Sequence, residues 1–188
     1  MTVEKRKRPS LHKAFGRVVL AALVLGALLG GAQTALAQQT KGASGLPLPR
    51  FVSFKSKKVN LRVGPGSNYA VSWMYLKAGL PVEITQEYDN WRKVRDADGT
   101  EGWVNQALLS GQRTAVTAPW MRGKGGNTYV NMRRDPQAGS SLVARLEPGV
   151  VIKLSRCNGE WCEASYDGTE GWVNQAEIWG AYPAEVFK

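Results

Sequence analysis

The chain contains the same ten residues twice. The segment DGTEGWVNQA occupies positions 98–107 and returns without a change at positions 167–176. The similarity extends well beyond this segment, since VNLRVGP at 59–65 matches VNMRRDP at 130–136. The offset between the copies drifts only from 71 residues at the earlier match to 69 at the later one. The chain is therefore a tandem duplication, and each copy has to form one small folding unit.

Each copy has the pattern of several short strands. In the first copy the segments VNLRV, SWMYLKA, PVEITQEY, WRKVR and TEGWVNQ are separated by the turn-forming GPG, Gly79, DN and DADG. Short alternating segments with tight polar turns are typical of small antiparallel barrels. We therefore expect an all-β protein made of two tandem small β-barrels of about five strands each.

The N-terminal segment has the pattern of a signal peptide. Six basic residues and one acidic residue precede position 18, and fifteen apolar residues follow at 18–32. Small residues end this segment at Ala37, which predicts cleavage between Ala37 and Gln38. An uncleaved anchor is the alternative, but a membrane span needs about 20 apolar residues. We expect export by the general secretory route to the periplasm or the exterior, with no stable membrane anchor after cleavage.

The repeat boundaries and the leader together divide the chain into six parts. The expected division is a signal peptide at 1–37, a linker at 38–50, a first domain at 51–112, a linker at 113–126, a second domain at 127–180 and a C-terminal tail at 181–188.

Composition excludes several classes of function. The formal charge is +10, and the leader holds a net +5 of it, so the exported part carries +5. This modest charge and the expected export argue against nucleic acid as a partner. The only histidine, His12, lies in the leader, and the only thiols are Cys157 and Cys162. A catalytic triad, a Cys/His pair and a usual zinc site are then out of reach, so we expect no enzyme activity, no metal and no cofactor.

The two cysteines flank the turn-forming segment NGEW. In an exported protein, two cysteines on either side of a hairpin turn are most simply a disulfide between Cys157 and Cys162. A redox-active pair is the alternative, but the spacing is C-x4-C rather than C-x-x-C and no helix begins nearby. We expect a structural disulfide.

The order of the short motifs resembles the bacterial SH3 domain. In the first copy these motifs are VNLRVGPGSNY, LKAGLPVEI, NWRKV and GTEGWVNQALL, and in the second VNMRRDP, LEPGVVIKL, GEWCEASYDGTEGWV and IWGAYP. The resemblance covers residues 51 to about 180 and implies a non-catalytic barrel. Many such domains bind peptidoglycan or its peptides, and others bind proteins. The second copy departs from the pattern at 135–137, where GPG becomes DPQ and the following loop is expected to be one residue shorter.

Alternation along the strands separates core residues from surface residues. In WRKVR, Val94 is expected to face the core, which places Trp91 and Lys93 on the outer face. In GWVN, Val104 is the better core residue, so Trp103 needs cover from a loop, from the other copy or from a ligand. In the second copy the same logic buries Cys162 and Ala164. It turns Trp161, like Trp172 on the next strand, outward.

The copies differ most in their aromatic residues. The first offers Tyr69, Trp73 and Tyr75 in SNYAVSWMY, beside Arg62, whereas the aligned AGSSLVARL has no aromatic residue. Aromatic side chains in a shallow groove suit sugars and peptides. The SH3 resemblance implies that the residue at the position of Trp91 lines the ligand groove. The candidate ligand-binding residues are Tyr69, Trp73, Tyr75, Trp91, Arg62 and Trp161.

Two functions follow from these patterns. The first is an exported, non-catalytic binding module that recognises cell-wall peptide, peptidoglycan or an envelope protein through the first domain. The alternative is a structural or adaptor protein that makes protein contacts without binding the wall, with Trp103 and Trp172 packed at domain contacts.

Overall fold

A computed structural model describes residues 40–126 and 128–188. The expected signal peptide and its cleavage position between Ala37 and Gln38 lie outside these residues. Within the described ranges, no helix is long and apolar enough to cross a membrane.

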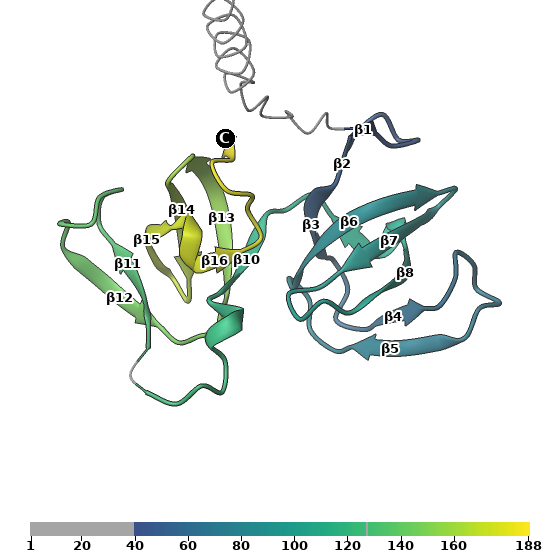
Figure 1. Cartoon of the computed structure of the whole chain (residues 1–188), viewed down its shortest axis with the longest axis horizontal. Helices are drawn as coiled ribbons and strands as arrows, with labels where there is room; N and C mark the ends of the chain where they lie inside the picture. The colour runs from purple at the N-terminus through teal and green to yellow at the C-terminus, as the bar shows by residue number, and fades with distance from the viewer. Residues whose placement is uncertain (1–39, 127) are drawn as a thin grey trace, which may run out of the picture. The chain divides into compact units, whose positions relative to one another are not determined.

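The first copy folds into one antiparallel sheet that curls around its own core (Figure 1). Its strands are ordered β5-β4-β8-β7-β6-β3-β9. A 3-10 turn, η2 (Gln106–Leu108), connects β8 to β9. The strands of this first barrel are β3 (Arg50–Phe54), β4 (Val59–Arg62), β5 (Val71–Tyr75), β6 (Pro81–Tyr88), β7 (Trp91–Arg95), β8 (Glu101–Asn105) and β9 (Leu109–Ser110).

The second copy repeats this order strand for strand as β12-β11-β15-β14-β13-β10-β16. Two 3-10 turns accompany it, η3 (Pro119–Met121) and η4 (Gln175–Glu177). The strands of this second barrel are β10 (Thr114–Thr117), β11 (Val130–Arg133), β12 (Leu142–Leu146), β13 (Val151–Asn158), β14 (Trp161–Tyr166), β15 (Thr169–Asn174) and β16 (Ile178–Trp179), and β17 (Val186–Phe187) also pairs with β13. The prediction of an all-β protein with two tandem barrels is confirmed.

Each barrel begins with a strand that the five-strand pattern did not contain. In the second barrel this strand is β10, which lies inside the segment 113–126 that was expected to be a linker. All four of its residues are buried, including Thr114 and Thr117, so it shows no alternation of polar and apolar residues. The hydroxyl of Thr117 donates to the carbonyl of Glu147 at 2.6 Å, which satisfies this buried polar group.

The segments on either side of the two barrels are also structured. Residues of the expected linker 38–50 form a hairpin from β1 (Thr40–Lys41) and β2 (Pro47–Leu48). The expected tail 181–188 supplies β17 and returns along the second barrel. Both segments therefore extend the structure beyond the strands of the duplicated pattern.

The repeated decapeptide closes each barrel. Val104 and Val173 are fully buried, as are Val94 and Cys162, which confirms the predicted inward face of these strands. The glycine two residues before each valine allows a neighbouring strand to approach closely. A Cβ added to Gly102 would lie 2.5 Å from Leu61 Cγ, and one added to Gly171 would lie 2.6 Å from the Cγ of Met132.

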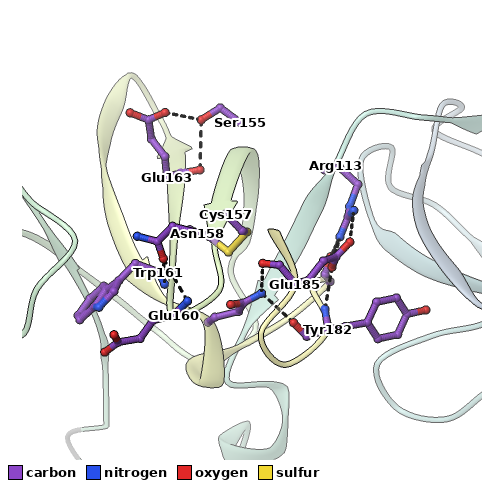
Figure 2. Close-up of a disulfide and its surroundings, with 12 residues drawn as sticks. Arg113, Ser155, Cys157, Asn158, Glu160, Trp161, Glu163, Tyr182 and Glu185 are labelled. Atoms are coloured by element: carbon purple, nitrogen blue, oxygen red, sulfur yellow. Dashed lines mark hydrogen bonds and ion pairs between the residues drawn. A yellow bond between two sulfur atoms is a disulfide. The ribbon is translucent and has the colours of Figure 1, made fainter. Parts of the chain in front are cut away.

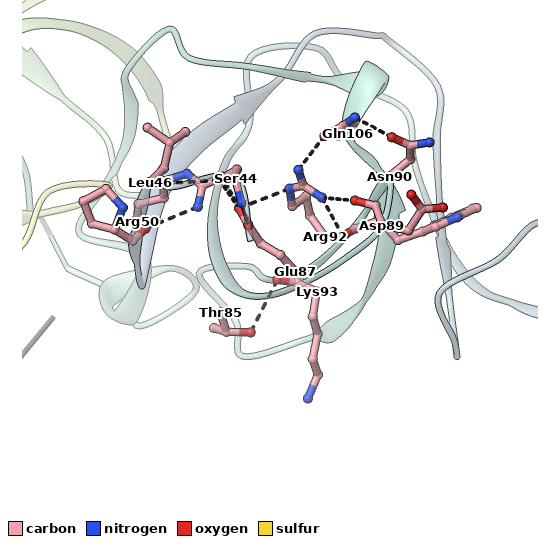
Figure 3. Close-up of polar contacts among 12 residues, drawn as sticks. Ser44, Leu46, Arg50, Thr85, Glu87, Asp89, Asn90, Arg92, Lys93 and Gln106 are labelled. Carbon is pink, nitrogen blue, oxygen red and sulfur yellow. Dashed lines mark hydrogen bonds and ion pairs between the residues drawn. The ribbon is translucent and has the colours of Figure 1, made fainter. Parts of the chain in front are cut away.

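The predicted disulfide is present between Cys157 and Cys162, which face each other across β13 and β14 with their Cα atoms 4.1 Å apart (Figure 2). The first barrel has Glu87 and Arg92 at the same cross-strand position of β6 and β7. The Glu87 carboxylate lies 3.3 Å from Arg92 and also accepts hydrogen bonds from Ser44 and Arg50 (Figure 3). A buried ionic cluster therefore takes the place of the disulfide.

Aromatic residues of the two barrels touch one another. The Phe51 ring lies 4.9 Å from the Trp179 ring and 4.7 Å from the Tyr182 ring, centroid to centroid. The Tyr182 hydroxyl donates to Glu83 at 2.9 Å. Trp172, which was considered for a domain contact, instead lies under the guanidinium of Arg156 in its own barrel, 5.0 Å away.

Candidate functional site

The outer face of the first barrel carries the best-defined group of candidate residues. Strand pairing places Arg62 opposite Trp103 and Trp103 opposite Lys93, while Trp91 lies opposite Asn105. Side chains directly opposite one another share a face of an antiparallel sheet. This face holds a cavity of about 320 Å³ lined by Lys58, Asn60, Arg62, Trp91, Asn105 and Leu108, which we call the Trp91 cavity.

The Trp91 cavity is basic, with amide groups on its wall. The guanidinium of Arg62 donates to the carbonyl of Tyr69 at 2.6 Å. Within residues 40–126 and 128–188, no carboxylate lies within ion-pair distance of Arg62 or Lys58. Asn60 presents a buried side-chain oxygen with no hydrogen-bond partner in the described part of the chain. The arrangement suits a ligand with a carboxylate for the cations and a flat or apolar surface for Trp91.

The second barrel has the same tryptophan in a closed environment. Trp161 pairs with Asn174 as Trp91 pairs with Asn105, but its side chain is only 5% exposed. Trp161 was expected to point away from the core, and the core cluster of this barrel does not include it, but other side chains cover it. Its neighbours Cys162 and Ala164 face the core as predicted. Alternation along a strand predicts whether a side chain points towards or away from the core. It does not predict whether other side chains cover a residue that points away.

A carboxylate also appears in the second barrel at a position that is apolar in the first. Leu108 ends the turn η2 and lines the Trp91 cavity, whereas Glu177 ends the matching turn η4. Burial raises the pKa of Glu177, and the nearby charge of Arg133 opposes that rise. Arg133 is the counterpart of Arg62, so in the second barrel this arginine has an internal anion near it.

The loops between the first two strands of the pattern differ in chemistry but not in length. Residues 63–70 connect β4 to β5, and residues 134–141 connect β11 to β12. The expected one-residue deletion in the second loop is wrong, because strand pairing places it after β12 instead. In the first loop the Tyr69 ring covers Gly64, where an added Cβ would meet the ring at 2.3 Å.

The second loop replaces this packing with hydrogen bonds. Ser140 stands where Tyr69 does, and Asp135 stands where Gly64 does. The hydroxyl of Ser140 lies 2.8 Å from the Asp135 carboxylate and accepts from the Asp135 amide at 2.9 Å. Each loop is thus held by its own matched pair of residues.

The aromatic candidates of the first copy do not form one cluster with Trp91. Trp73 is 57% exposed and lines a different cavity, together with Tyr75. Tyr75 itself is only 8% exposed and packs on Phe54 at 4.8 Å, so only a small part of its side chain can reach a ligand. Tyr69 is 43% exposed, and its carbonyl accepts a hydrogen bond from Arg62, which lines the Trp91 cavity.

Four residues of the Trp91 cavity were not among the candidates from the sequence. Asn60 and Asn105 recur in the second copy, so their repetition indicated a structural role. Asn105 does have one, since its side chain accepts from the amide of Ala107 at 3.0 Å. Lys58 belongs to the basic run Lys55, Lys57 and Lys58, which indicated a solvated edge when taken alone and an anionic ligand when taken with the aromatic residues. Leu108 lies in the turn η2, and its position carried no signal of its own.

A comparison with protein-family models identifies the family of both barrels. The model described as "Bacterial SH3 domain" matches residues 55–111 and, separately, residues 126–180. The chain belongs to the bacterial SH3 domain family. Its two bacterial SH3 domains are the first and second barrels, and the recognition of two tandem copies from the sequence is confirmed.

Solved structures that resemble the chain carry little further information. NlpC2 from Trichomonas vaginalis is 12% identical, with a TM-score of 0.31 over 70% of this chain and 48% of that protein. NlpC1 from Trichomonas vaginalis is also 12% identical, with a TM-score of 0.30 over 73% of this chain and 48% of that protein.

An NlpC/P60 family protein from Bacillus cereus is 8% identical, with a TM-score of 0.30 over 69% of this chain and 55% of that protein. This chain therefore spans about half the length of these proteins. Likeness at this level supports no inference about activity. No curated protein sequence matches the chain.

The two SH3 domains differ in what their matching faces offer. In the first SH3 domain, Trp91 lines an open cavity beside two cations. In the second SH3 domain, Trp161 is buried and a glutamate lies near the matching arginine. One domain therefore has a surface able to take an anionic ligand at this position, and the other has the same position closed.

Proposed function

We propose that the protein is an exported, non-catalytic binding module whose first SH3 domain recognises cell-wall peptide through the Trp91 cavity. Membership of the bacterial SH3 family and the disulfide between Cys157 and Cys162 both fit an exported protein. The peptides of the wall end in carboxylates, and Arg62 and Lys58 would bind these anions.

The contrast between Trp91 and Trp161 is the observation that carries this proposal. Both residues begin the same strand of the same fold, but Trp91 lines a cavity whereas Trp161 is buried. A tryptophan needed only for the barrel would be expected to have the same surroundings in both copies. Its exposure in one copy, beside an arginine that has no carboxylate partner among the described residues, supports a ligand for that copy.

The ligand would bind by charge and by stacking. Arg62 and Lys58 would hold a terminal carboxylate through charge-assisted hydrogen bonds. The amide of Asn60 would take a donor from the peptide, and the Trp91 ring would cover an apolar side chain or sugar face. The carbonyl of Tyr69 keeps the Arg62 guanidinium in place before the ligand arrives.

Co-sedimentation with purified peptidoglycan sacculi tests the proposal. The unaltered protein should pellet with sacculi at moderate salt, and R62Q should lower its affinity about tenfold because a charge-assisted contact is lost. R133Q in the second domain is the matched control, since Arg133 donates to the carbonyl of Ser140 at 2.8 Å as Arg62 does to that of Tyr69. Trp91→Ala should weaken binding as well.

Two results would remove wall binding from consideration. One is a failure of the unaltered protein to pellet with sacculi. The other is an equal loss of sacculus affinity in R62Q and R133Q. Such a result would show that the arginine acts by holding its own loop in place and not by contacting the ligand.

A protein partner is the second candidate, and one surface favours it. The edge strand β5 leaves apolar side chains exposed at Val71, Trp73 and Met74, and Leu76 follows them. Exposed apolar groups on an edge strand suit a protein contact. This function predicts that crosslinking in intact cells captures a protein at these positions, and that sacculi do not bind.

A further inference from the structure

A second cavity, lined mainly by the first SH3 domain and also by Val116 and Arg122 of the second, has the opposite charge from the Trp91 cavity. Its volume is about 380 Å³, and Trp73, Tyr75, Pro81, Asp96, Asp98 and Arg122 are among the residues that line it. We call it the Trp73 cavity. None of these residues lines the Trp91 cavity, so the two sites can be altered separately.

The floor of the Trp73 cavity is held by hydrogen bonds. The Tyr75 hydroxyl donates to one carboxylate oxygen of Asp96 at 2.7 Å. Burial, followed by the hydrogen bond and charge of Asp96, raises the pKa of Tyr75, so this residue remains a donor. The other oxygen of Asp96 accepts from the amides of Asp98 and Thr100 at 3.0 and 2.8 Å.

The rim of the cavity remains accessible. Trp73 is 57% exposed, and the side chain of Asp98 is 62% exposed. Asp96 is already engaged by three donors, so Asp98 is the carboxylate that can meet a ligand. An exposed indole beside a carboxylate is a combination that attracts cations, through the ring quadrupole and through charge.

The chain places one of its own cations at this rim. The guanidinium of Arg122 lies 3.4 Å from the Asp98 carboxylate and lines the Trp73 cavity. Its side chain is 48% exposed, and ion pairs that are this exposed contribute little to stability. Arg122 is therefore a weakly held guanidinium that another one can displace.

We propose that the Trp73 cavity binds the guanidinium of an arginine-bearing peptide, which takes the place of Arg122 on Asp98 and packs against Trp73. The charges agree with this, because in the part of the chain that the structure describes two carboxylates and one cation line the cavity. The second SH3 domain lacks the site: Ala144 stands at the position of Trp73, and Tyr166 at that of Asp96.

The test is fluorescence anisotropy with the whole protein and a labelled peptide, acetyl-Gly-Arg-Gly-amide. The peptide should bind, and its citrulline analogue, which has the same shape without the charge, should not. W73A and D98N should each weaken binding about threefold to tenfold, because each removes one of the two attractions. R122Q should strengthen binding about threefold, because the internal competitor is gone.

The R122Q variant distinguishes a site that binds a ligand from an ion pair with only a structural role. If R122Q left the affinity unchanged or lowered it, or if citrulline bound as well as arginine, the proposal would be overturned. The matched controls are D167N, which alters the same turn in the second domain, and Trp120→Ala, which removes an exposed tryptophan there. Both should bind the peptide normally. R62Q should also bind it normally, so failure of the wall-binding proposal leaves this one standing.

Discussion

Glu87 and Arg92 form a buried ion pair at the position where the second SH3 domain has a disulfide. The two side chains face each other across β6 and β7, as Cys157 and Cys162 do across β13 and β14. The Glu87 side chain is 1% exposed, and that of Arg92 is 8% exposed. The same hairpin is therefore held by charge and hydrogen bonds in one domain and by a covalent bond in the other.

Removing the charge of Glu87 should destabilise the first domain. Burial opposes ionisation of Glu87, but the hydrogen bonds from Ser44 and Arg50 and the charge of Arg92 outweigh it and lower its pKa to about 2. In E87Q the buried Arg92 loses its anion, at a cost of about 3 kcal/mol in the free energy of unfolding. Urea denaturation at neutral pH measures this loss.

The same ion pair makes stability depend on pH. The folded-state pKa of Glu87 is below its usual value of 4.5, so its contribution is present above that pH and is lost as the pH falls towards 2. E87Q should lack this part of the acid sensitivity. E101Q is the control, since Glu101 is an exposed partner of Lys93. The E101Q protein should still lose stability as the pH falls towards 2. An E87Q protein as acid-sensitive as the unaltered protein would contradict the assignment.

Reduction of the disulfide should destabilise the second domain selectively. Closing a loop with a sequence separation of 5 contributes about 2 kcal/mol through the entropy of the unfolded chain. The double variant Cys157→Ala with Cys162→Ala should show the same loss without reductant. Hydrogen exchange resolves the two domains, and equal destabilisation of both would contradict the expectation.

The loop at residues 63–70 should depend on Gly64 and Tyr69 as a pair. Gly64→Asp alone should destabilise the first domain by about 1 to 3 kcal/mol, because a Cβ there meets the Tyr69 ring. Adding Tyr69→Ser should recover much of the loss by creating the hydrogen bonds that Asp135 and Ser140 make. A double-mutant cycle of unfolding free energies measures the coupling. Simple additivity would show that the two residues are independent.

The hydrogen bond between Tyr182 and Glu83 should contribute to stability across the two barrels. Tyr182→Phe removes the donor at 2.9 Å and should cost about 1 kcal/mol in thermal or urea unfolding. Arg95 still pairs with Glu83, which limits the cost. Tyr166→Phe is the control, because Tyr166 is 43% exposed, and it should have almost no effect.

The repeated pattern predicted the fold because repetition and alternation report directly on the barrel interior. Val94, Val104 and Cys162 were assigned to the core correctly, and so was the disulfide. The strand β10 was missed because a strand buried on both faces shows no alternation, and its threonines resemble a linker. Pairing that depends on residues far apart, such as Thr117 with Glu147, leaves no local signal.

The candidate site was predicted only in part, and for a related reason. Arg62 and Trp91 do share a cavity, but Trp73 and Tyr75 line another one. Neighbouring positions on a strand point to opposite faces, and a curled sheet carries them to different cavities. The buried state of Trp161 depends on what covers the outer face, which a single strand does not encode.

The equal length of the two loops at residues 63–70 and 134–141 has a practical consequence. Each loop closes in the same way, with the amide of Val63 bonded to the carbonyl of Ala70 and that of Arg134 bonded to Ser141. Each also contains its own internal packing partners. Each loop therefore carries its own stabilising contacts. Replacing residues 63–70 by residues 134–141 should give the first domain the loop surface of the second without changing any strand.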